Sequence, residues 1–507
     1  MRDPEFVPAR RRRFITSAVV LLSMVLGGGW LLVGVASAQA IGAWTQSQGD
    51  AAHTGSLPEA AQPPYVESWH LDVPPEGPGA DFGLSQPVVD GTTVIAVGPT
   101  SILAADLATG RQLWSVERDY GPSVSPAIAG AAERRILIYS EGFGDSPPGA
   151  SATPSASTTG SSSPSPSGSD GGKFDSHVAA IDLDTRKPAW DAPLQLEAVS
   201  RTGVTVDGDT AFLGDNAGNV YAVDVATGEL RWTVDAEGFL TTSIAVSDGF
   251  VIVTVQGDRS THPHLVAFDE SDGSRAWDEE IQGGAVFASS PAIGDGRVVA
   301  GFSDQTVRGF DIADGTERWS TRLNSPLFFT GAPALTPDAV VVVDTFGQVY
   351  RLDPTTGDRV WDYALNEAVT RSPGVTAGAS ALVATSSGRL AAIDLESGLL
   401  VWQSEQGSGL LRTLALTPQV VVGVRGGVEP GLVAFAQDPD GALVSLVSPT
   451  ELDVAELLLA FLAAAIPLTL LSILAGRWML ARMGPAFLDD EDDTSALAID
   501  PIEGGDA

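Results

Sequence analysis

The chain has 507 residues, of which 64 are acidic and 28 are basic, so its formal net charge at pH 7 is -36. This excess of negative charge repels nucleic-acid phosphates and argues against a general nucleic-acid binder. Cysteine is absent, which excludes disulfides, thiolate nucleophiles, cysteine-ligated metals, covalently attached c-type haem and a lipid anchor on cysteine.

The N-terminal segment, residues 1–40, has the layout of an export signal. Four arginines at 10–13 precede the uncharged, mostly apolar run 14–38, which ends in small residues at 36–38. This pattern predicts a cleaved signal peptide, but the run is also long enough to span a bilayer as an uncleaved signal anchor. The arginines fit either a twin-arginine export motif or the positive-inside rule, so the export route stays open.

The central stretch repeats one unit, an apolar run followed by Asp, Thr-Gly and Trp. Residues 220–232 show it most fully, as V-Y-A-V-D-V-A-T-G-E-L-R-W. From Trp190 onward the repeat tryptophans lie 42, 45, 42, 42 and 41 residues apart, a period typical of solenoids and propellers. The tryptophans that we assign to structural positions of the repeat are Trp69, Trp114, Trp190, Trp232, Trp277, Trp319, Trp361 and Trp402.

Each period also predicts four short strands separated by turn residues. In the period from Thr242 the expected strands are 242–246, 250–255, 264–269 and 275–279. Four antiparallel strands in a period of this length form one propeller blade. The predicted fold class is therefore all-β, a β-propeller of four-stranded antiparallel blades over residues 41–448.

The number of blades follows from a mismatch between two counts. There are eight first-strand patterns of small polar and then apolar residues, but seven copies of the Asp, Gly and Trp skeleton. The last repeat has Ala436 and Ser445 in place of its Asp and Trp, whereas Trp69 precedes the first repeat. We therefore predict that the strand around Trp69 completes the last blade, which makes the propeller eight-bladed and leaves no edge strand exposed.

The residues of the repeat have structural roles. In D-x-x-T-G the Asp and Thr side chains suit hydrogen bonds within a tight turn, and Gly accepts a positive φ. The Trp that follows lies on the outer strand, where its ring can pack against the neighbouring blade. The copy at Asp182 has Arg186 in place of Gly, which predicts a looser turn.

Residues 146–172 interrupt the second blade with a sequence of almost pure Ser, Pro, Thr, Gly and Ala. This composition cannot bury a core, and it predicts disorder. Other blades have a short turn between the second and third strands at this place. The insert is therefore expected to be a surface loop, either a tolerated insertion or an O-glycosylated tract.

After the propeller, residues 456–482 predict a transmembrane helix. Its core, 457–475, has nineteen residues without a charge and spans about 28 Å as a helix. Arg477 and Arg482 follow this core, which places the acidic tail 483–507 in the cytoplasm by the positive-inside rule. The propeller is then expected outside the cytoplasm, held at the cytoplasmic membrane.

Trp44 and the motif Asp50-Ala-Ala-His53-Thr54-Gly55, together with the repeats, resemble proteins with pyrroloquinoline-quinone-like (PQQ-like) propeller repeats. That superfamily includes BamB-like scaffolds, which are not enzymes, and quinoprotein dehydrogenases, which bind PQQ and calcium over the channel. The second resemblance implies a cofactor. However, the chain lacks the vicinal cysteine pair of those enzymes and a recognisable set of the other ligands. We expect no cofactor, with PQQ and calcium as the disfavoured alternative.

Three arginines are candidate binding residues. Arg201, Arg371 and Arg412 occupy equivalent positions at the first strands of blades three, seven and eight, which predicts that they lie on one rim of the channel. Converging guanidinium groups can bind an anionic ligand or the carboxylates of a partner. The alternative is that each arginine pairs with a local Asp or Glu.

A second candidate is a metal site formed by Asp258, His262 and His264, which fall in the loop between the second and third strands of blade four. Two histidines in such a loop are ordinarily just exposed, so we predict no metal site. Catalytic residues are not predicted either, because the sequence has no phosphate-binding glycine loop and no hydrolase nucleophile signature.

Together these features predict a non-enzymatic, membrane-anchored propeller that acts as a protein-interaction or ligand-binding scaffold in the cell envelope. The expected partners are other envelope or membrane proteins. Two alternatives stay open, a PQQ-dependent quinoprotein dehydrogenase and a ligand sensor that signals through the cytoplasmic tail. The expected interaction face is the one opposite the Thr-Gly turns, where the loops 146–172 and 257–263 should open.

Overall fold

A computed structural model describes residues 44–74, 83–119, 121–131, 134–142, 176–257, 261–323, 331–369, 374–427 and 429–443. In these ranges the regular elements are strands, and no helix is long and apolar enough to cross a membrane. Four predicted segments lie outside the described residues: the export signal 1–40, the insert 146–172, the helix 456–482 and the tail 483–507.

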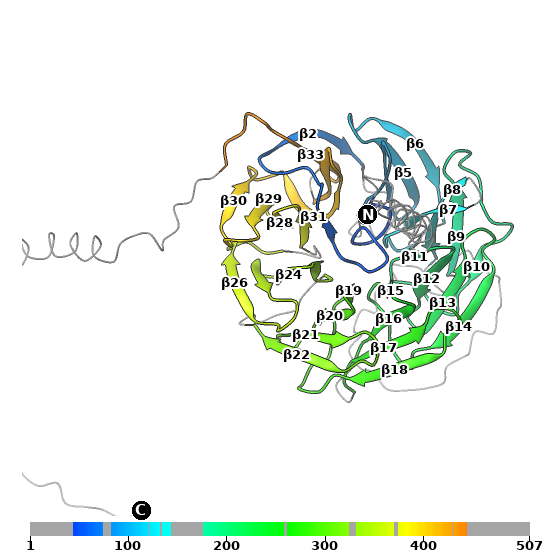
Figure 1. Cartoon of the computed structure of the whole chain (residues 1–507). Coiled ribbons are helices and arrows are strands. Elements are labelled where there is room, and N and C mark those ends of the chain that lie inside the picture. Colours follow the sequence, from blue (N-terminus) through cyan, green and yellow to red (C-terminus); the bar gives the residue numbers. More distant parts are fainter. Residues whose placement is uncertain are drawn as a thin grey trace, which may run out of the picture. The chain divides into compact units, whose positions relative to one another are not determined.

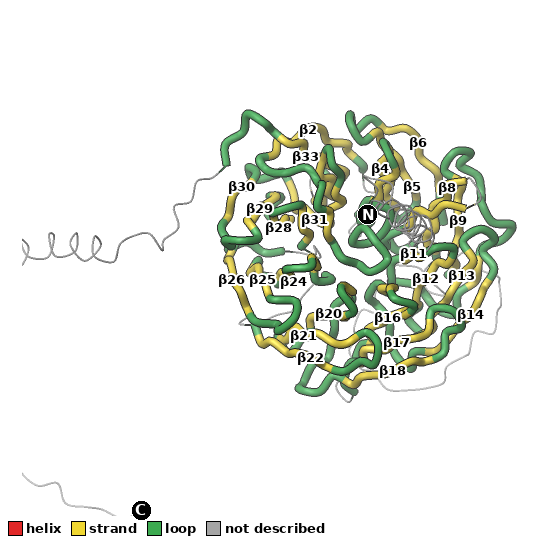
Figure 2. The backbone as a smooth tube through the Cα atoms, viewed as in Figure 1, coloured by secondary structure: helices red, strands yellow, loops and turns green. Residues whose placement is uncertain are grey.

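The strands form eight sheets arranged as blades in a ring (Figure 1). Each blade has four antiparallel strands, and the seventh carries one additional short strand in parallel. Figure 2 shows these strands as successive yellow segments around the ring. The predicted all-β, eight-bladed propeller is therefore confirmed for the described residues.

The strands of the first four blades follow one another along the chain. Blades 1 and 2 consist of β3 (Val88–Asp90), β4 (Thr93–Val97), β5 (Ser101–Asp106), β6 (Gln112–Glu117), β7 (Ala127–Ala131), β8 (Arg134–Glu141), β9 (His177–Asp182) and β10 (Leu194–Gln195). Blades 3 and 4 consist of β11 (Thr205–Asp207), β12 (Thr210–Gly214), β13 (Asn219–Asp224), β14 (Leu230–Asp235), β15 (Ala245–Ser247), β16 (Phe250–Val255), β17 (His264–Asp269) and β18 (Arg275–Glu280).

The remaining blades continue this order and then return to the start of the chain. Blades 5 and 6 consist of β19 (Ala292–Gly294), β20 (Arg297–Gly301), β21 (Thr306–Asp311), β22 (Glu317–Arg322), β23 (Ala334–Thr336), β24 (Ala339–Val343), β25 (Gln348–Leu352) and β26 (Arg359–Ala364). Blades 7 and 8 consist of β1 (Ser56–Leu57), β27 (Val375–Ala377), β28 (Ser380–Ala384), β29 (Leu390–Asp394), β30 (Leu400–Gln403), β31 (Gly409–Leu416), β32 (Val420–Gly427), β33 (Gly431–Gln437) and β2 (Tyr65–Asp72).

The ring has two faces because antiparallel neighbouring strands place successive turns at opposite ends of a blade. We call one the Thr-Gly face; it holds the turns between the first and second and between the third and fourth strands, such as 90–92 and 107–111. We call the other the loop face; it holds the turns between the second and third strands and the connections between blades, such as 98–100 and 118–126.

The repeat tryptophans join each blade to the next. Trp190 donates its indole N–H to the carbonyl of Val225 at 3.0 Å, and a Cβ added to Gly228 would lie 2.4 Å from the indole ring. Gly228 also has a φ of 77°, so this turn needs glycine for both its conformation and its close approach. The same indole bond joins Trp69 to Leu107, Trp232 to Glu270, Trp277 to Ile312, Trp319 to Pro354 and Trp361 to Leu395.

Apolar cores fill the seams between blades. Trp114 packs against the core shared by blades 1 and 2, and buried residues such as Ile136 and Leu213 form the core shared by blades 2 and 3. Burying the apolar faces of both blades at each seam is the main favourable contribution to the stability of the ring. Six of the eight repeat tryptophans thus also bond the neighbouring blade through their indole N–H.

The ring closes as predicted from Trp69. Strand β2 pairs antiparallel with β33, with Trp69 opposite Ala434, so the start of the chain supplies the outer strand of the last blade. At this closing seam Tyr65 takes the place of a turn glycine and meets the ring of Trp402 edge-on at 5.2 Å between centroids.

The turn with Arg186 differs from the prediction. Arg186 adopts a φ of 60° and donates its N–H to the carbonyl of Asp182 at 2.7 Å, as Gly228 does to Asp224 at 2.8 Å. The prediction of a looser turn is therefore wrong. The turn is held by the Asp carboxylate, which accepts the N–H of Thr185 at 2.7 Å, and a non-glycine residue tolerates this φ at a modest cost.

Residues 44–61 encircle the channel and contact all eight blades, which the sequence did not predict; we call this segment the clasp. It begins as the blue segment near the centre of the ring in Figure 1. In the first seven blades, the second residue of the first strand donates its N–H to the clasp. The bonds run from Val89 to Trp44, Ile128 to Thr45, Val206 to the Gln46 side chain, Val246 to Ala51, Ile293 to Ala52, Leu335 to Thr54 and Thr376 to Gly55, and Ala61 donates to Thr417 of blade 8.

Candidate interaction face

The Thr-Gly face is occupied by structural contacts. In the first blade the carboxylate of Asp106 accepts hydrogen bonds from the backbone N–H of Thr109 at 3.0 Å and from its hydroxyl at 2.7 Å. The bond from the hydroxyl is the main reason why the pKa of Asp106 lies below its ordinary value. The Asp and Thr side chains of this turn are thus engaged within the turn itself.

Both ends of the described chain also lie on the Thr-Gly face. Trp44 accepts the N–H of Val89, directly before the first turn of blade 1, and Asp438 donates to Pro64 at 2.8 Å, directly before β2. The loop face is therefore not covered by the clasp or by residues 438–443. Most connections between blades on this face are also longer than the turns of the Thr-Gly face, and binding residues occur disproportionately on such loops, so the loop face is the candidate interaction face.

The structure describes two of the three predicted arginines. Arg201 is exposed in the connection between blades 2 and 3, on the loop face. Arg412 is half-buried in β31, with its guanidinium 3.3 Å from where a Cβ of Gly83 would lie. Arg371 lies outside the described residues. The convergence of the three side chains on one rim stays a prediction.

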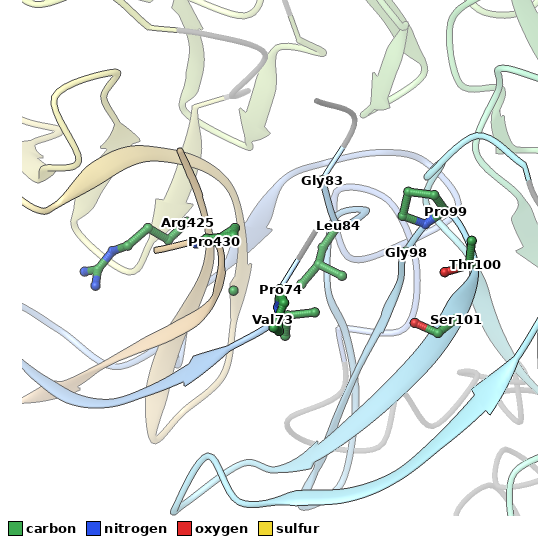
Figure 3. Close-up of a pocket in the computed structure, with 11 residues that line it drawn as sticks. Val73, Pro74, Gly83, Leu84, Gly98, Pro99, Thr100, Ser101, Arg425 and Pro430 are labelled. Carbon is green, nitrogen blue, oxygen red and sulfur yellow. The ribbon is translucent and has the colours of Figure 1, made fainter. Parts of the chain in front are cut away.

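A small pocket lies on the loop face at the seam of blades 8 and 1 (Figure 3). Val73, Leu84 and Pro430 give it an apolar lining, and the guanidinium of Arg425 points away from these side chains in Figure 3. Arg425 instead binds Glu67 at 2.8 Å. The volume of the pocket is about 40 Å³, whereas ligand pockets measure roughly 300–1,000 Å³, so it does not accommodate a cofactor.

A larger groove of about 410 Å³ lies at the closing seam between blades 7 and 8. Tyr65, Trp402 and Phe435 form its apolar part, and Glu67 and Glu405 its acidic part. The groove runs along the seam from Tyr65, at the start of β2, to Gly388 and Gly407 in the loop-face segments of blade 7 and its connection to blade 8. Its size suits a small ligand or the side chains of a peptide.

A buried charged cluster lies at the base of the insert. Arg118, whose side chain is fully buried, donates to the carbonyl of Ser140 at 2.9 Å and lies 3.7 Å from Glu141, which binds His177 at 2.9 Å. Burial is the main reason why the pKa of Arg118 lies below its ordinary value. Atoms of Asp119, Glu141 and His177 lie within 4.8 Å of one another, a spacing that suits a cation. The guanidinium of Arg118 already supplies positive charge there, so we interpret the cluster as a group of ionic contacts that joins blades 1 and 2.

The two histidines considered for a metal each pair with a different carboxylate. His262 contacts Glu280 at 2.7 Å, and His264 contacts Asp278 at 2.6 Å. Asp258, the third candidate ligand, lies outside the described residues. The imidazoles are thus engaged separately on β18, which argues against a shared metal.

Three large apolar side chains on the loop face were not predicted as site residues. Phe239, Phe287 and Phe346 are 47%, 49% and 52% exposed. Phenylalanine in a repeat of apolar strands is ordinarily assigned to the core, which is why composition and periodicity gave no signal. The signal that could have identified them is their place outside the strands, in turns where other blades have smaller residues.

The comparisons with known proteins point to one family. A family profile described as outer membrane protein assembly factor BamB, of the second PQQ-like repeat type, matches residues 175–327 and 303–450, which together exceed half of the chain. Among curated proteins, 136 residues are 28% identical to the outer membrane protein assembly factor BamB of Yersinia pestis, covering 24% of this chain and 33% of that protein. A further 114-residue match is 27% identical to the same factor of Moranella endobia, covering 21% of this chain and 28% of that protein. The chain thus spans about a third or less of the curated relatives it matches.

Solved structures match over a larger part of the chain. The crystal structure of BamB from Moraxella catarrhalis superposes with a TM-score of 0.53 at 15% identity, covering 74% of this chain and all of that one. The computationally designed protein Ika8 superposes with a TM-score of 0.52, also at 15% identity, covering 70% of this chain and 96% of that one. At this identity the likeness shows the fold alone. A designed protein also has this fold, which illustrates that fold does not imply function.

Proposed function

The chain belongs to the PQQ-like repeat family described as outer membrane protein assembly factor BamB, and from that premise we propose that it is a non-enzymatic scaffold that binds partner proteins. Its relatives in that family are named as assembly factors and not as enzymes. The proposed partners are other proteins of the cell envelope or membrane. The proposed binding surface is the loop face.

The observation that supports the proposal is that one face of the ring is built from recurring contacts and the other is not. On the Thr-Gly face the same Asp, Gly and Trp contacts recur from blade to blade, as in the bonds of Trp190 and Trp232 to the next blade. On the loop face the turns differ in length and in residue type. A ring that is constant on one face and varied on the other suits recognition of a partner by the varied face.

We further propose that the protein is anchored in the cytoplasmic membrane with its propeller outside the cytoplasm. The support comes from the sequence, where the export signal 1–40 and the apolar segment 456–482 agree in orientation by the positive-inside rule. Since the chain has no cysteine, a peptide segment has to take the role that a cysteine-linked lipid has in other envelope proteins.

Photo-crosslinking from two positions of one blade tests the scaffold. Ala217 is exposed on the loop face of blade 3 and Ala226 is exposed on its Thr-Gly face, so each can be replaced by a photoreactive phenylalanine derivative in the full-length protein in its native membrane. We expect a discrete adduct from position 217, and none from position 226. Adducts from neither position, nor from other loop-face turns, would contradict a scaffold that uses this face.

A spectroscopic control addresses the enzymatic alternative. Adding PQQ and calcium to the purified protein is expected to produce no quinone-protein spectrum and no substrate-dependent reduction of a dye. Dye reduction on adding the cofactor would replace the scaffold with a dehydrogenase.

A further inference from the structure

The three exposed phenylalanines of the loop face lie in three consecutive blades. Phe239 lies in the connection that enters blade 4, Phe287 in the connection that enters blade 5, and Phe346 in the turn between the second and third strands of blade 6. Each is about half exposed. Large exposed apolar side chains on the loop-face turns of successive blades offer anchor points for another molecule.

The segments that carry Phe239 and Phe287 are tied together by one glutamine. Gln256 donates its backbone N–H to the carbonyl of Phe239 at 2.9 Å, and its side chain bonds both the N–H and the carbonyl of Ala288. On the other side of Phe287, the hydroxyl of Ser303 accepts the N–H groups of Val286 at 2.8 Å and Phe287 at 3.0 Å. The backbone that carries these two phenylalanines is therefore held in place before binding, so ordering it in a complex costs little further.

Phe346 is held in the same way by a turn of its own. The buried carboxylate of Asp344 accepts the N–H groups of Phe346 and Gln348, each at 2.9 Å. Gly347 closes the turn with a bond to the carbonyl of Asp344. An exposed aromatic ring on a rigid turn loses little entropy in a complex, which is the property of a binding hot spot.

Other blades show that the fold does not need phenylalanine at these positions. In blade 3 the carboxylate of Asp215 accepts the N–H of Ala217 at 2.9 Å, so Ala217 is the structural equivalent of Phe346. In blade 7 the carbonyl of Ala368 accepts a bond from Ser386, as the carbonyl of Phe239 does from Gln256. Because alanine serves in both geometries, the phenylalanines of blades 4 to 6 have a purpose other than forming the turns.

The charge of the chain limits what the occupant can be. The net charge is -36; Glu237, two residues before Phe239, pairs with Arg275 at 3.3 Å while 73% of its side chain stays exposed. Such a surface attracts positive charge over a distance. Aromatic rings add to this, because a cation is attracted to the face of a ring.

We propose that Phe239, Phe287 and Phe346 form the partner-binding patch of the loop face and that their occupant is a protein segment carrying both apolar and basic side chains. This inference rests on the proposed scaffold function and names the partner's chemistry for it. The apolar side chains of the occupant pack on the phenylalanines, and its basic side chains are attracted by the net negative charge of the chain.

Peptide binding to the full-length protein in detergent tests the chemistry of the occupant. The probe is a fluorescent synthetic peptide of arginine and leucine residues, followed by anisotropy. Two counterparts have glutamate in place of arginine or serine in place of leucine. We expect both counterparts to bind at least about tenfold more weakly than the probe. Equal or tighter binding of either counterpart would overturn the proposed chemistry.

Matched triple variants test the place of binding. The first changes Phe239, Phe287 and Phe346 to alanine, and the second changes Leu113, Leu230 and Val360, which are 38%, 43% and 50% exposed on outer strands, to alanine. We expect the first to weaken binding of the probe about tenfold or more and the second less than about twofold. Equal losses from the two variants, or none from the first, would overturn the proposal.

The same variants in native membranes separate this inference from the scaffold function. Crosslinking from position 217 gives an adduct with the unchanged protein if the scaffold function holds, and we expect that adduct to be lost from the Phe triple variant. An undiminished adduct from the triple variant would overturn the patch and leave the scaffold standing. If neither position 217 nor the other loop-face turns give an adduct in the unchanged protein, the scaffold function itself is contradicted.

Discussion

The two faces of the ring are built from the same strands but follow different rules. On the Thr-Gly face, Gly228 must be glycine because its added Cβ would meet Trp190 at 2.4 Å. On the loop face, one turn geometry accepts Ala217 in blade 3 and Phe346 in blade 6. One face is therefore constrained by contacts between blades, and the other is free to vary in side chains. The comparison indicates that substitutions on the Thr-Gly face mainly affect stability and that substitutions on the loop face mainly affect recognition.

The largest effect is expected from removing part of the clasp, which contacts the inner strands of every blade. Deleting residues 44–55 leaves seven backbone N–H groups of the inner strands without their partners, and each such bond is worth about 1 kcal/mol. Trp44, which is 1% exposed, is lost from the core at the same time. We expect the free energy of unfolding to fall by about 5 kcal/mol or more, measured by denaturant unfolding.

A deletion between β8 and β9 is the control for this prediction. Removing residues 146–172, a longer segment that the sequence predicts to be a surface loop, is expected to change the free energy of unfolding by less than about 1 kcal/mol, since long surface loops cost little in stability. If the two deletions had equal effects, the clasp would not be the element that holds the ring.

A second prediction compares two glycines that differ in their surroundings. Gly228→Ala combines overpacking against Trp190 with a left-handed φ, so we expect a loss of about 3 kcal/mol. Gly208→Ala has a φ of 56° but no atom within 4 Å of the added Cβ, so about 1 kcal/mol is expected. Thermal unfolding of both variants measures the difference. Similar losses would show that the approach of Trp190 is not what the glycine serves.

The third prediction concerns pH and the buried histidine of the clasp. His53 is fully buried, its Nε2 lies 3.3 Å from the Thr205 hydroxyl, and burial lowers its pKa to about 4. The folded state thus binds this proton less readily than the unfolded state, whose pKa is about 6.5. The stability that His53 contributes is therefore present above pH 6.5 and is lost as pH falls toward 4, by about 3 kcal/mol in total.

Other carboxyls also titrate in this window, since burial raises the pKa of Glu270 and Glu279 as well as that of Asp50. Burial raises the pKa of neighbouring Asp50, which acts in the opposite direction because its folded form takes up a proton more readily. The turn carboxylates with lowered pKa, such as Asp106, act below their ordinary value of 3.8. We expect His53→Asn, which tolerates the φ of 57°, to flatten the dependence of stability on pH between 6.5 and 4. An unchanged slope in this variant would show that another group is responsible.

The sequence predicted the architecture well because each repeat has the same residue types at the same structural positions. Trp232 and most of its equivalents lie in the outer strands, although β10 (Leu194–Gln195) begins after Trp190, and the missing Trp of the last repeat predicted correctly that Trp69 closes the ring. In blade 4 the expected second and third strands, 250–255 and 264–269, match β16 and β17. These features depend on residue type and spacing, which a sequence displays directly.

The features that the sequence did not reveal depend on something else. The clasp is held chiefly by backbone N–H groups, such as those of Val89 and Ile128, and every residue except proline carries one. The tie between Arg118 and His177 joins residues that are far apart in the chain, across the insert. The turn at Arg186 was predicted wrongly because the Asp carboxylate, and not glycine, holds it. Arg201, Arg371 and Arg412 share a sequence position, but that position alone does not tell where a long side chain reaches.

The smallest effect on stability is expected on the loop face, and it sharpens the comparison of the two faces most. Phe346→Ala converts the turn of blade 6 into the turn of blade 3, where Ala217 has the same hydrogen bond. The free energy of unfolding should change by no more than about 0.5 kcal/mol, although a large side chain is removed. Asp344→Ala in the same turn should cost about 1–3 kcal/mol, because its buried carboxylate holds two backbone N–H groups. If Phe346→Ala were as destabilising as Asp344→Ala, the ring of Phe346 would belong to the fold, and the loop face would be no freer than the Thr-Gly face.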